Sequence, residues 1–229
     1  MSKHIACTAI LLALGCLPLH ALELRAGAVG GAGAGFAAGS LITNRETVLS
    51  ELAATSVSGQ TEVGLTWSAG AYLELEFSRP FGLRFELSYL SHQNATLVSD
   101  SSGAPIDRIG VSYTAIYLPI LARGRLPFGP GALVGSLGPY AGMSMGTTLY
   151  DQYASTSTTA SFQPYQLYFG GEAGVGYEFP AGPGIASVEA RGLLPFTSAL
   201  LGGPAASGNY YPQGVYLMIS YGFTLGGRR

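Results

Sequence analysis

The chain has 229 residues, of which 48% are hydrophobic and only 10% are charged, with 11 Lys and Arg against 13 Asp and Glu. Average globular proteins carry about 25% charged residues and about 7% glycine, whereas this chain holds 34 glycines and has a mean hydropathy of +0.32. No window supplies the run of about 18 apolar residues that a membrane-spanning helix needs, which excludes a helical membrane protein. A single lysine, Lys3, and a net charge of -2 argue against a nucleic-acid binder. The 14 Tyr and 10 Phe exclude a disordered chain.

The chain begins with the layout of a secretory signal peptide, a short basic start followed by an apolar stretch. We expect cleavage after Ala21, which divides the chain into a signal peptide (1–21) and a single mature domain (22–229). Lipoprotein processing at Cys16 is the alternative. Because Cys7 and Cys16 both lie in the signal peptide, the mature domain would have no thiol for a disulfide or a thiolate metal site.

Alternating hydrophobicity dominates the rest of the sequence. Residues 64–78 place apolar side chains at odd positions and small or polar ones at even positions without a slip, which is the period of a strand and not of a helix. After a Pro/Gly turn at 79–82 the alternation resumes over 83–89, so the two segments predict a hairpin. In the segment 108–125 the odd positions, such as Tyr113 and Tyr117, form the expected apolar face.

Eight strands are expected in all. They are 23–36, 64–78, 83–89, 108–125, 139–150, 163–179, 185–194 and 213–225. Long polar connections are expected at 37–63, 91–107, 151–162 and 197–212, and short Pro/Gly connections at 79–82, 126–138 and 180–184.

Strands of ten or so residues with long and short connections in strict alternation are typical of outer-membrane barrels. A sheet in lipid must leave no open edge and therefore closes on itself, with apolar side chains outside. The sequence thus predicts an all-β fold, an eight-stranded antiparallel transmembrane up-and-down β-barrel with both termini in the periplasm and four loops outside. Aromatic residues near strand ends are expected to mark the membrane interfaces: Trp67, Phe77, Phe85, Tyr89, Tyr165, Tyr177, Phe179 and Phe223.

Four stretches carry a family resemblance: 82–89, 117–123, 139–142 and 170–176. Through these stretches the mature chain resembles the small outer-membrane β-barrel domain proteins, which are the eight-stranded porin-like and opacity-protein-like group. The resemblance implies a bacterial outer-membrane location, contact with outer-membrane lipid, and insertion by the barrel assembly machinery. Members usually end on an aromatic residue, whereas here six residues follow Phe223. We expect a monomer without cofactor or metal.

The charged residues are expected to line the lumen. Reflecting the first hairpin about its turn sets Glu76 opposite Arg84 and Glu74 opposite Glu86, and the hairpin around 180–184 brings Glu172 near Arg191. The expected lumen set is Glu74, Glu76, Arg84, Glu86, Glu172, Glu178, Glu189 and Arg191, an excess of four formal negative charges. This charged lumen has three possible roles: a structural plug of paired side chains, a narrow cation-preferring pore, or a catalytic carboxylate pair.

An enzymatic function finds little support in the sequence. His92 is the only histidine of the mature domain, and we expect it to be a solvated residue at the outer rim. A lipid-modifying site would need it to act with Ser91 and with Asp100 or Asp107, but their spacing matches no known arrangement. The glycine-rich stretch 29–36 lacks the βαβ context of a nucleotide-binding loop.

The expected outer loops differ in character. Residues 43–46 form a capping box before an apolar helical pattern, which predicts a short amphipathic helix. The sequence therefore favours a non-enzymatic, porin-like outer-membrane barrel that admits small solutes, with a narrow cation-preferring channel as the specific form. The alternative is a non-conducting structural or adhesin-like barrel that binds extracellular ligands through its loops.

Overall fold

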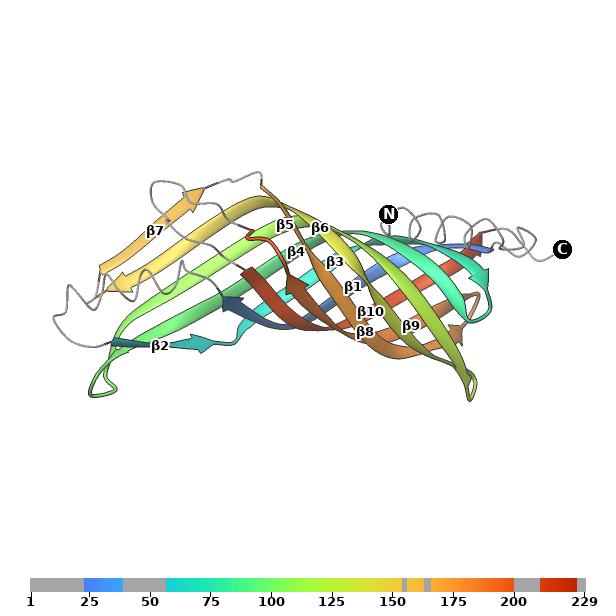
Figure 1. Ribbon diagram of the computed structural model, residues 1–229, viewed down its shortest axis with the longest axis horizontal. Coiled ribbons are helices and arrows are strands. Elements are labelled where there is room, and N and C mark those ends of the chain that lie inside the picture. Colours follow the sequence, from blue (N-terminus) through green and yellow to red (C-terminus); the bar gives the residue numbers. More distant parts are fainter. Residues whose placement is uncertain (1–22, 39–56, 154–155, 163–165, 200–210, 226–229) are drawn as a thin grey trace, which may run out of the picture.

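The structure is a computed structural model and describes residues 23–38, 57–153, 156–162, 166–199 and 211–225. The elements form one antiparallel sheet (Figure 1). They are β1 (Glu23–Ala38), β2 (Val57–Glu62), β3 (Gly64–Ser78), β4 (Phe81–Asp100), β5 (Pro105–Phe128), β6 (Gly131–Tyr153), β7 (Thr156–Phe162), β8 (Leu167–Ala181), β9 (Gly184–Pro195) and β10 (Tyr211–Leu225). Within these ranges no helix is long and apolar enough to cross a membrane.

The sheet closes because β1 pairs with β3 on one side and with β10 on the other. The ring of the described chain therefore runs β1, β3, β4, β5, β6, β8, β9, β10, which confirms the predicted eight-stranded up-and-down barrel. The two remaining strands prolong the wall: β2 precedes β3 with only Val63 between them and pairs with the far part of β4, and β7 pairs with the far part of β6.

Three short turns lie at the barrel end where β1 begins and β10 ends (Figure 1). They follow β3 at 79–80, β5 at 129–130 and β8 at 182–183. Gly129 and Gly182 have positive φ angles of 58° and 60°, a conformation that other residues adopt only with strain. Glycine at these positions therefore permits the tight reversals that set strand register.

The opposite end of the barrel is longer than the sequence predicts. The expected loop at 91–107 is wrong, since β4 extends to Asp100 and β5 begins at Pro105. At the short-turn end, the connection expected at 126–138 is wrong as well, since β5 continues to Phe128 and β6 begins at Gly131. Much of 151–162 is also strand, in β6 and β7, and 57–62 forms β2. The far part of the sheet, formed by β2, β7 and the adjoining parts of β4, β5 and β6, is rich in Ser and Thr and does not sort apolar residues to one side. It is strand because neighbouring backbones pair, a contribution that a hydrophobic pattern cannot reveal.

Most strands face as predicted, with exposed apolar side chains outside, for example Leu73 on β3, Leu87 on β4 and Leu217 on β10. The apolar face predicted for 108–125 is wrong. Tyr113 and Tyr117 on β5 point inward and are buried, whereas the even positions point outward. Both faces of this strand are apolar near its centre, so alternation alone does not select the outer one.

Tyrosine rings inside the barrel pack on glycines of the adjacent strand. Tyr140 on β6 is paired with Gly170 on β8, and Tyr168 on β8 is paired with Gly142 on β6. A Cβ atom on Gly142 would lie 2.1 Å from Cζ of Tyr168, and one on Gly170 would lie 2.3 Å from Cζ of Tyr140. The absence of a side chain at these glycines therefore gives the rings the space they occupy.

Several predictions concern residues outside the described ranges. These are the signal peptide and its cleavage after Ala21, the fate of Cys7 and Cys16, the helix expected after the capping box at 43–46, and the interfacial role of Tyr165.

Candidate functional site

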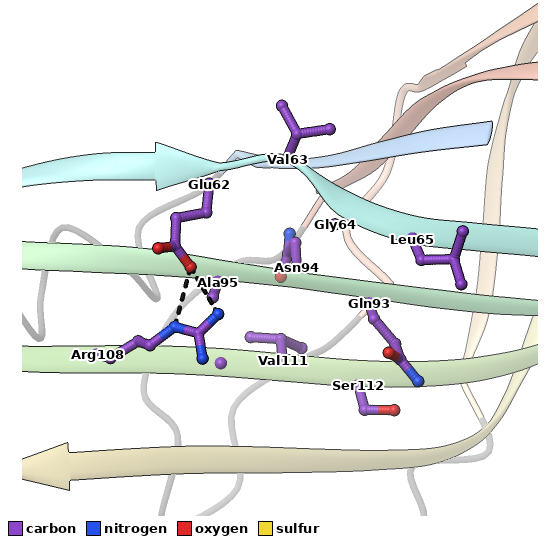
Figure 2. Close-up of a pocket in the computed structure, with 11 residues that line it drawn as sticks. Glu62, Val63, Gly64, Leu65, Gln93, Asn94, Ala95, Arg108, Val111 and Ser112 are labelled. Atoms are coloured by element: carbon purple, nitrogen blue, oxygen red, sulfur yellow. Dashed lines mark hydrogen bonds and ion pairs between the residues drawn. The ribbon is translucent and has the colours of Figure 1, made fainter.

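A groove marks the outer wall of the barrel, at the junction of β2 and β3 with β4 and β5 (Figure 2). Its volume is about 570 Å³. Arg108 and Glu62 pair at one end, with Arg108 Nη2 2.8 Å from Glu62 Oε2, while Gln93 and Ser112 lie toward the other end. The lining residues are Glu62, Val63, Gly64, Leu65, Gln93, Asn94, Ala95, Arg108, Gly110, Val111 and Ser112.

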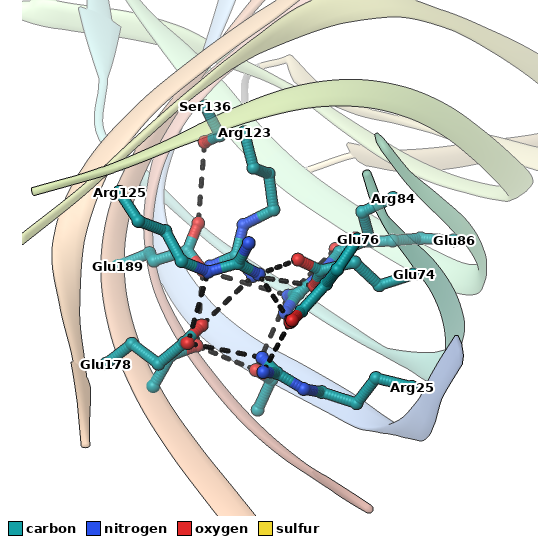
Figure 3. Close-up of polar contacts among 12 residues, drawn as sticks. Arg25, Glu74, Glu76, Arg84, Glu86, Arg123, Arg125, Ser136, Glu178 and Glu189 are labelled. Atoms are coloured by element: carbon teal, nitrogen blue, oxygen red, sulfur yellow. Dashed lines mark hydrogen bonds and ion pairs between the residues drawn. The ribbon is translucent and has the colours of Figure 1, made fainter. Parts of the chain in front are cut away.

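The interior holds a cluster of arginines and glutamates that come from strands all around the ring (Figure 3). Glu74 lies near its centre and is fully buried. Its Oε2 accepts hydrogen bonds from Arg84 Nε at 2.8 Å and Arg123 Nη1 at 2.7 Å, and its Oε1 accepts one from Arg125. One carboxylate from β3 thus joins one arginine of β4 and two of β5.

Arg123 extends the cluster to the far wall. Its Nη2 lies 2.5 Å from Glu189 Oε1 on β9, and its Nη1 lies 3.4 Å from Glu178 Oε2 on β8. Arg25 on β1 pairs with Glu76 and lies 3.2 Å from Glu178. Because a buried charge is costly unless it is paired and hydrogen-bonded, these contacts are what makes the charged interior tolerable.

A second group of pairs lies around Arg191. This guanidinium donates to Glu172 Oε1 at 3.0 Å and to Glu189 Oε2 at 3.1 Å, and it binds both carboxylate oxygens of Glu86. Glu172 also accepts a hydrogen bond from the Tyr117 hydroxyl. Tyr117 begins a group of packed tyrosines, with its ring centroid 4.9 Å from that of Tyr140. The charged pairs around Arg191 therefore adjoin a layer of packed tyrosine rings inside the barrel, and Tyr117 contacts both groups.

The structure gives the positions of all eight residues of the expected lumen set. Seven are buried and Glu76 is partly buried. Six of them form ion pairs within the set, whereas in the described part of the chain Glu76 and Glu178 pair only with arginines outside it. Sequence reasoning missed Arg25, Arg123 and Arg125. Arg123 and Arg125 lie on the odd face of β5, which was assigned to lipid, and two charges on that face were the available signal against the assignment.

With these three arginines, the described cluster contains six glutamates and five arginines. Its formal charge is therefore −1, and the expected excess of four negative charges is wrong. The expected register of the first hairpin is wrong as well: Glu74 is opposite Arg84, Glu76 is opposite Gly82, and Glu86 is opposite Tyr72. The turn uses only residues 79–80, and a bulge between Glu76 and Ser78 adds to its effect, so the pairing differs by two residues from the expected reflection.

His92 is not the solvated rim residue that we expected. Its side chain is fully buried, and Nε2 lies 3.1 Å from the carbonyl oxygen of Phe36. Asp100 lies eight residues further along β4, about 26 Å away for an extended strand. Asp107 is paired with Val98, about 20 Å along the strand from His92. The residues of a lipid-modifying rim site are therefore not brought together, and the described ranges hold no group of three His, Cys, Asp or Glu suited to a metal.

This closed antiparallel ring, apolar outside and charged inside, has the architecture of a bacterial outer-membrane barrel. The sequence matches the model of the outer membrane protein beta-barrel domain family over residues 9–223, and the chain belongs to that family. Its location is the bacterial outer membrane. A search of curated protein sequences found no match.

Solved structures with a similar fold include small outer-membrane barrels. The attachment invasion locus protein Ail of Yersinia pestis is 12% identical with a TM-score of 0.39, over 88% of this chain and 99% of that one. OprG of Pseudomonas aeruginosa is 11% identical with a TM-score of 0.47, over 90% and 97%. Neisserial surface protein A is 11% identical with a TM-score of 0.36, over 87% and 95%.

Proposed function

We propose that this protein is a non-conducting outer-membrane barrel that binds extracellular ligands through the sheet extending beyond its outer rim. One observation carries the first half of the proposal. Six strands contribute to one interior cluster in which Arg84, Arg123 and Glu74 are almost completely buried. An eight-stranded barrel has an interior only wide enough for side chains, and this cluster fills it with large ones.

The extended wall supports the second half. A membrane crossing needs about 9–11 residues of tilted strand, whereas β4, β5 and β6 have 20, 24 and 23 residues. With β2 and β7 at its sides, their outer part forms a sheet in the order β2-β4-β5-β6-β7 that projects away from the short turns (Figure 1). A sheet joined to the barrel gives a rigid surface, which loses less entropy on binding than a mobile loop does.

Planar-bilayer conductance of the refolded protein tests the closed interior. We expect no discrete conductance steps from the wild type, and heat-modifiable gel mobility verifies that the barrel is folded. An Arg84→Ala/Arg123→Ala variant opens the interior and is expected to give conductance steps, which verifies that the assay is sensitive enough. The narrow cation-preferring channel remains the alternative function. Cation-selective steps from the wild type that weaken in Glu74→Gln/Glu86→Gln would establish that alternative and overturn the closed barrel.

A shortened hairpin tests the extended sheet. Thr96 and Ile109 are paired, so an Asn-Gly turn in place of residues 97–108 keeps the register of the barrel below it. We expect cells that display the full-length protein to adhere to epithelial monolayers or to other bacteria more strongly than cells that display the shortened one. Equal adhesion, with equal surface amounts of the two barrels, contradicts a binding role for this part of the sheet.

A further inference from the structure

We propose that the groove between Glu62, Gln93, Arg108 and Ser112 binds the saccharide headgroup of a glycolipid in the outer leaflet. The proposal concerns the outer wall and does not depend on whether the lumen conducts.

The depth of the groove in the membrane is the first argument. The outward face of β4 carries Leu87 and Tyr89 and then changes to Gln93, while Trp67 on β3 packs beside Tyr89 with ring centroids 5.4 Å apart. Trp and Tyr on the outer wall mark the membrane–water interface in barrels. The groove begins at Leu65, next along the outward face of β3 after Trp67, and therefore lies at the level of the outer-leaflet headgroups.

The chemistry of the lining is the second argument. Gln93 and Ser112 are paired across β4 and β5 and supply an amide and a hydroxyl beside each other. Val63, Leu65 and Ala95 supply apolar surface. Hydroxyls and amides next to apolar surface match a sugar ring, which has hydrogen-bonding edges and C–H faces, and a volume of about 570 Å³ lies in the range of small-ligand sites.

The charge of the groove distinguishes a saccharide from a simple anion. Arg108 donates from Nε at 2.9 Å and from Nη2 at 2.8 Å to the same oxygen, Oε2 of Glu62. The pair is therefore formally neutral. An anionic phosphate would have to compete with Glu62 for the guanidinium, whereas sugar hydroxyls can donate to the carboxylate and accept from the guanidinium without breaking the pair.

The test uses the full-length mature barrel in nanodiscs that contain either lipopolysaccharide or phosphatidylglycerol, an anionic lipid without a saccharide. Native mass spectrometry counts the lipid that each barrel retains, and fluorescence of Trp67, the single tryptophan, reports occupancy beside the groove. We expect lipopolysaccharide to be retained in preference to phosphatidylglycerol. Removal of two hydrogen-bonding groups in Gln93→Leu/Ser112→Val is expected to lower retention about tenfold.

Gln60→Leu is the matched control, since Gln60 is an exposed amide of β2 that does not line the groove. It is expected to retain lipopolysaccharide as the wild type does. Ala95→Phe, which fills the groove and keeps its polar groups, is expected to lower retention as well, and gel mobility verifies that each variant is folded. Equal retention by wild type and both groove variants overturns the site. Equal retention of phosphatidylglycerol and lipopolysaccharide overturns its saccharide preference.

Discussion

Arg191 and Glu86 join opposite walls of the barrel. Arg191 is on β9 and Glu86 is on β4, four strands apart in either direction around the ring. Two parallel hydrogen bonds connect them, Nη1 to Oε2 at 2.9 Å and Nη2 to Oε1 at 2.9 Å. Such a bidentate pair fixes the relative position of both groups, so it ties strands that share no backbone hydrogen bond.

The first prediction concerns this pair. Glu86→Gln leaves the buried Arg191 with fewer negative partners and is expected to lower the free energy of unfolding by about 3–5 kcal/mol. Glu86→Leu/Arg191→Met/Glu172→Gln removes both charges together with that of Glu172, the other carboxylate that Arg191 pairs with on β8, and is expected to recover most of the loss. Urea unfolding of the barrel in lipid vesicles, followed by heat-modifiable gel mobility, measures both effects.

Glu62→Gln is the control for this prediction, because it breaks a pair whose Arg108 side chain is 58% exposed. Exposed pairs contribute about 0–1 kcal/mol. If Glu86→Gln proves as mild as Glu62→Gln, the interior pair does not stabilise the barrel as described.

The second prediction concerns the glycines under the tyrosine rings. Gly142→Ala forces Tyr168 out of its position and is expected to destabilise the barrel by about 1–3 kcal/mol, as overpacking does. Gly135→Ala on the same strand is the control, since a Cβ atom there meets no atom within 4 Å. Comparison of the two unfolding midpoints tests the prediction. Equal midpoints would show that the ring moves without cost.

The third prediction concerns orientation. We expect the short turns to face the periplasm and the turn between β4 and β5 to face outward. Ser101→Cys is therefore expected to react with a membrane-impermeant maleimide in intact cells, and Arg79→Cys only after the outer membrane is permeabilised. Cys7 and Cys16 lie in the expected signal peptide, so the processed chain has no other thiol. The reverse labelling pattern would invert the proposed orientation and with it the exposure of the long sheet.

The fourth prediction concerns the outer turn at 101–104. Hydrogen bonds from the Ser102 hydroxyl and from the Ala104 amide lower the pKa of Asp100 from its ordinary value of 3.8. A lowered pKa means that the charged carboxylate stabilises the turn above the ordinary carboxyl range, and that this stabilisation is lost as the pH falls through the lowered value. Titration of the carboxyl carbon by NMR is expected to show the low pKa, and Ser102→Ala to raise it. No rise in this variant would exclude the hydroxyl as the cause.

Alternation in the sequence determined the number of barrel strands, their order and the outward face of most of them. Lipid imposes this pattern directly, because every second residue on a spanning strand must be apolar. Glu74, Glu86 and Arg191 were thereby recognisable as inward residues from their own strands alone.

The tertiary structure decided what local alternation leaves open. On β5, both faces are apolar near Tyr117, so alternation leaves the inner face open. Arg123 and Arg125 were the sequence signal for that face, and pairing with β4 and β6 fixes it. Partners such as Arg191 and Glu86 are 105 residues apart in the chain and meet because the ring closes. The extended sheet likewise depends on backbone pairing between neighbours. Lipid on one side of the barrel wall and the lumen on the other select which side chains face outward, and each strand records this choice in its own sequence. Ion pairs across the lumen depend instead on closure of the barrel, and the strands beyond the membrane depend on the register between neighbours. No single segment specifies either.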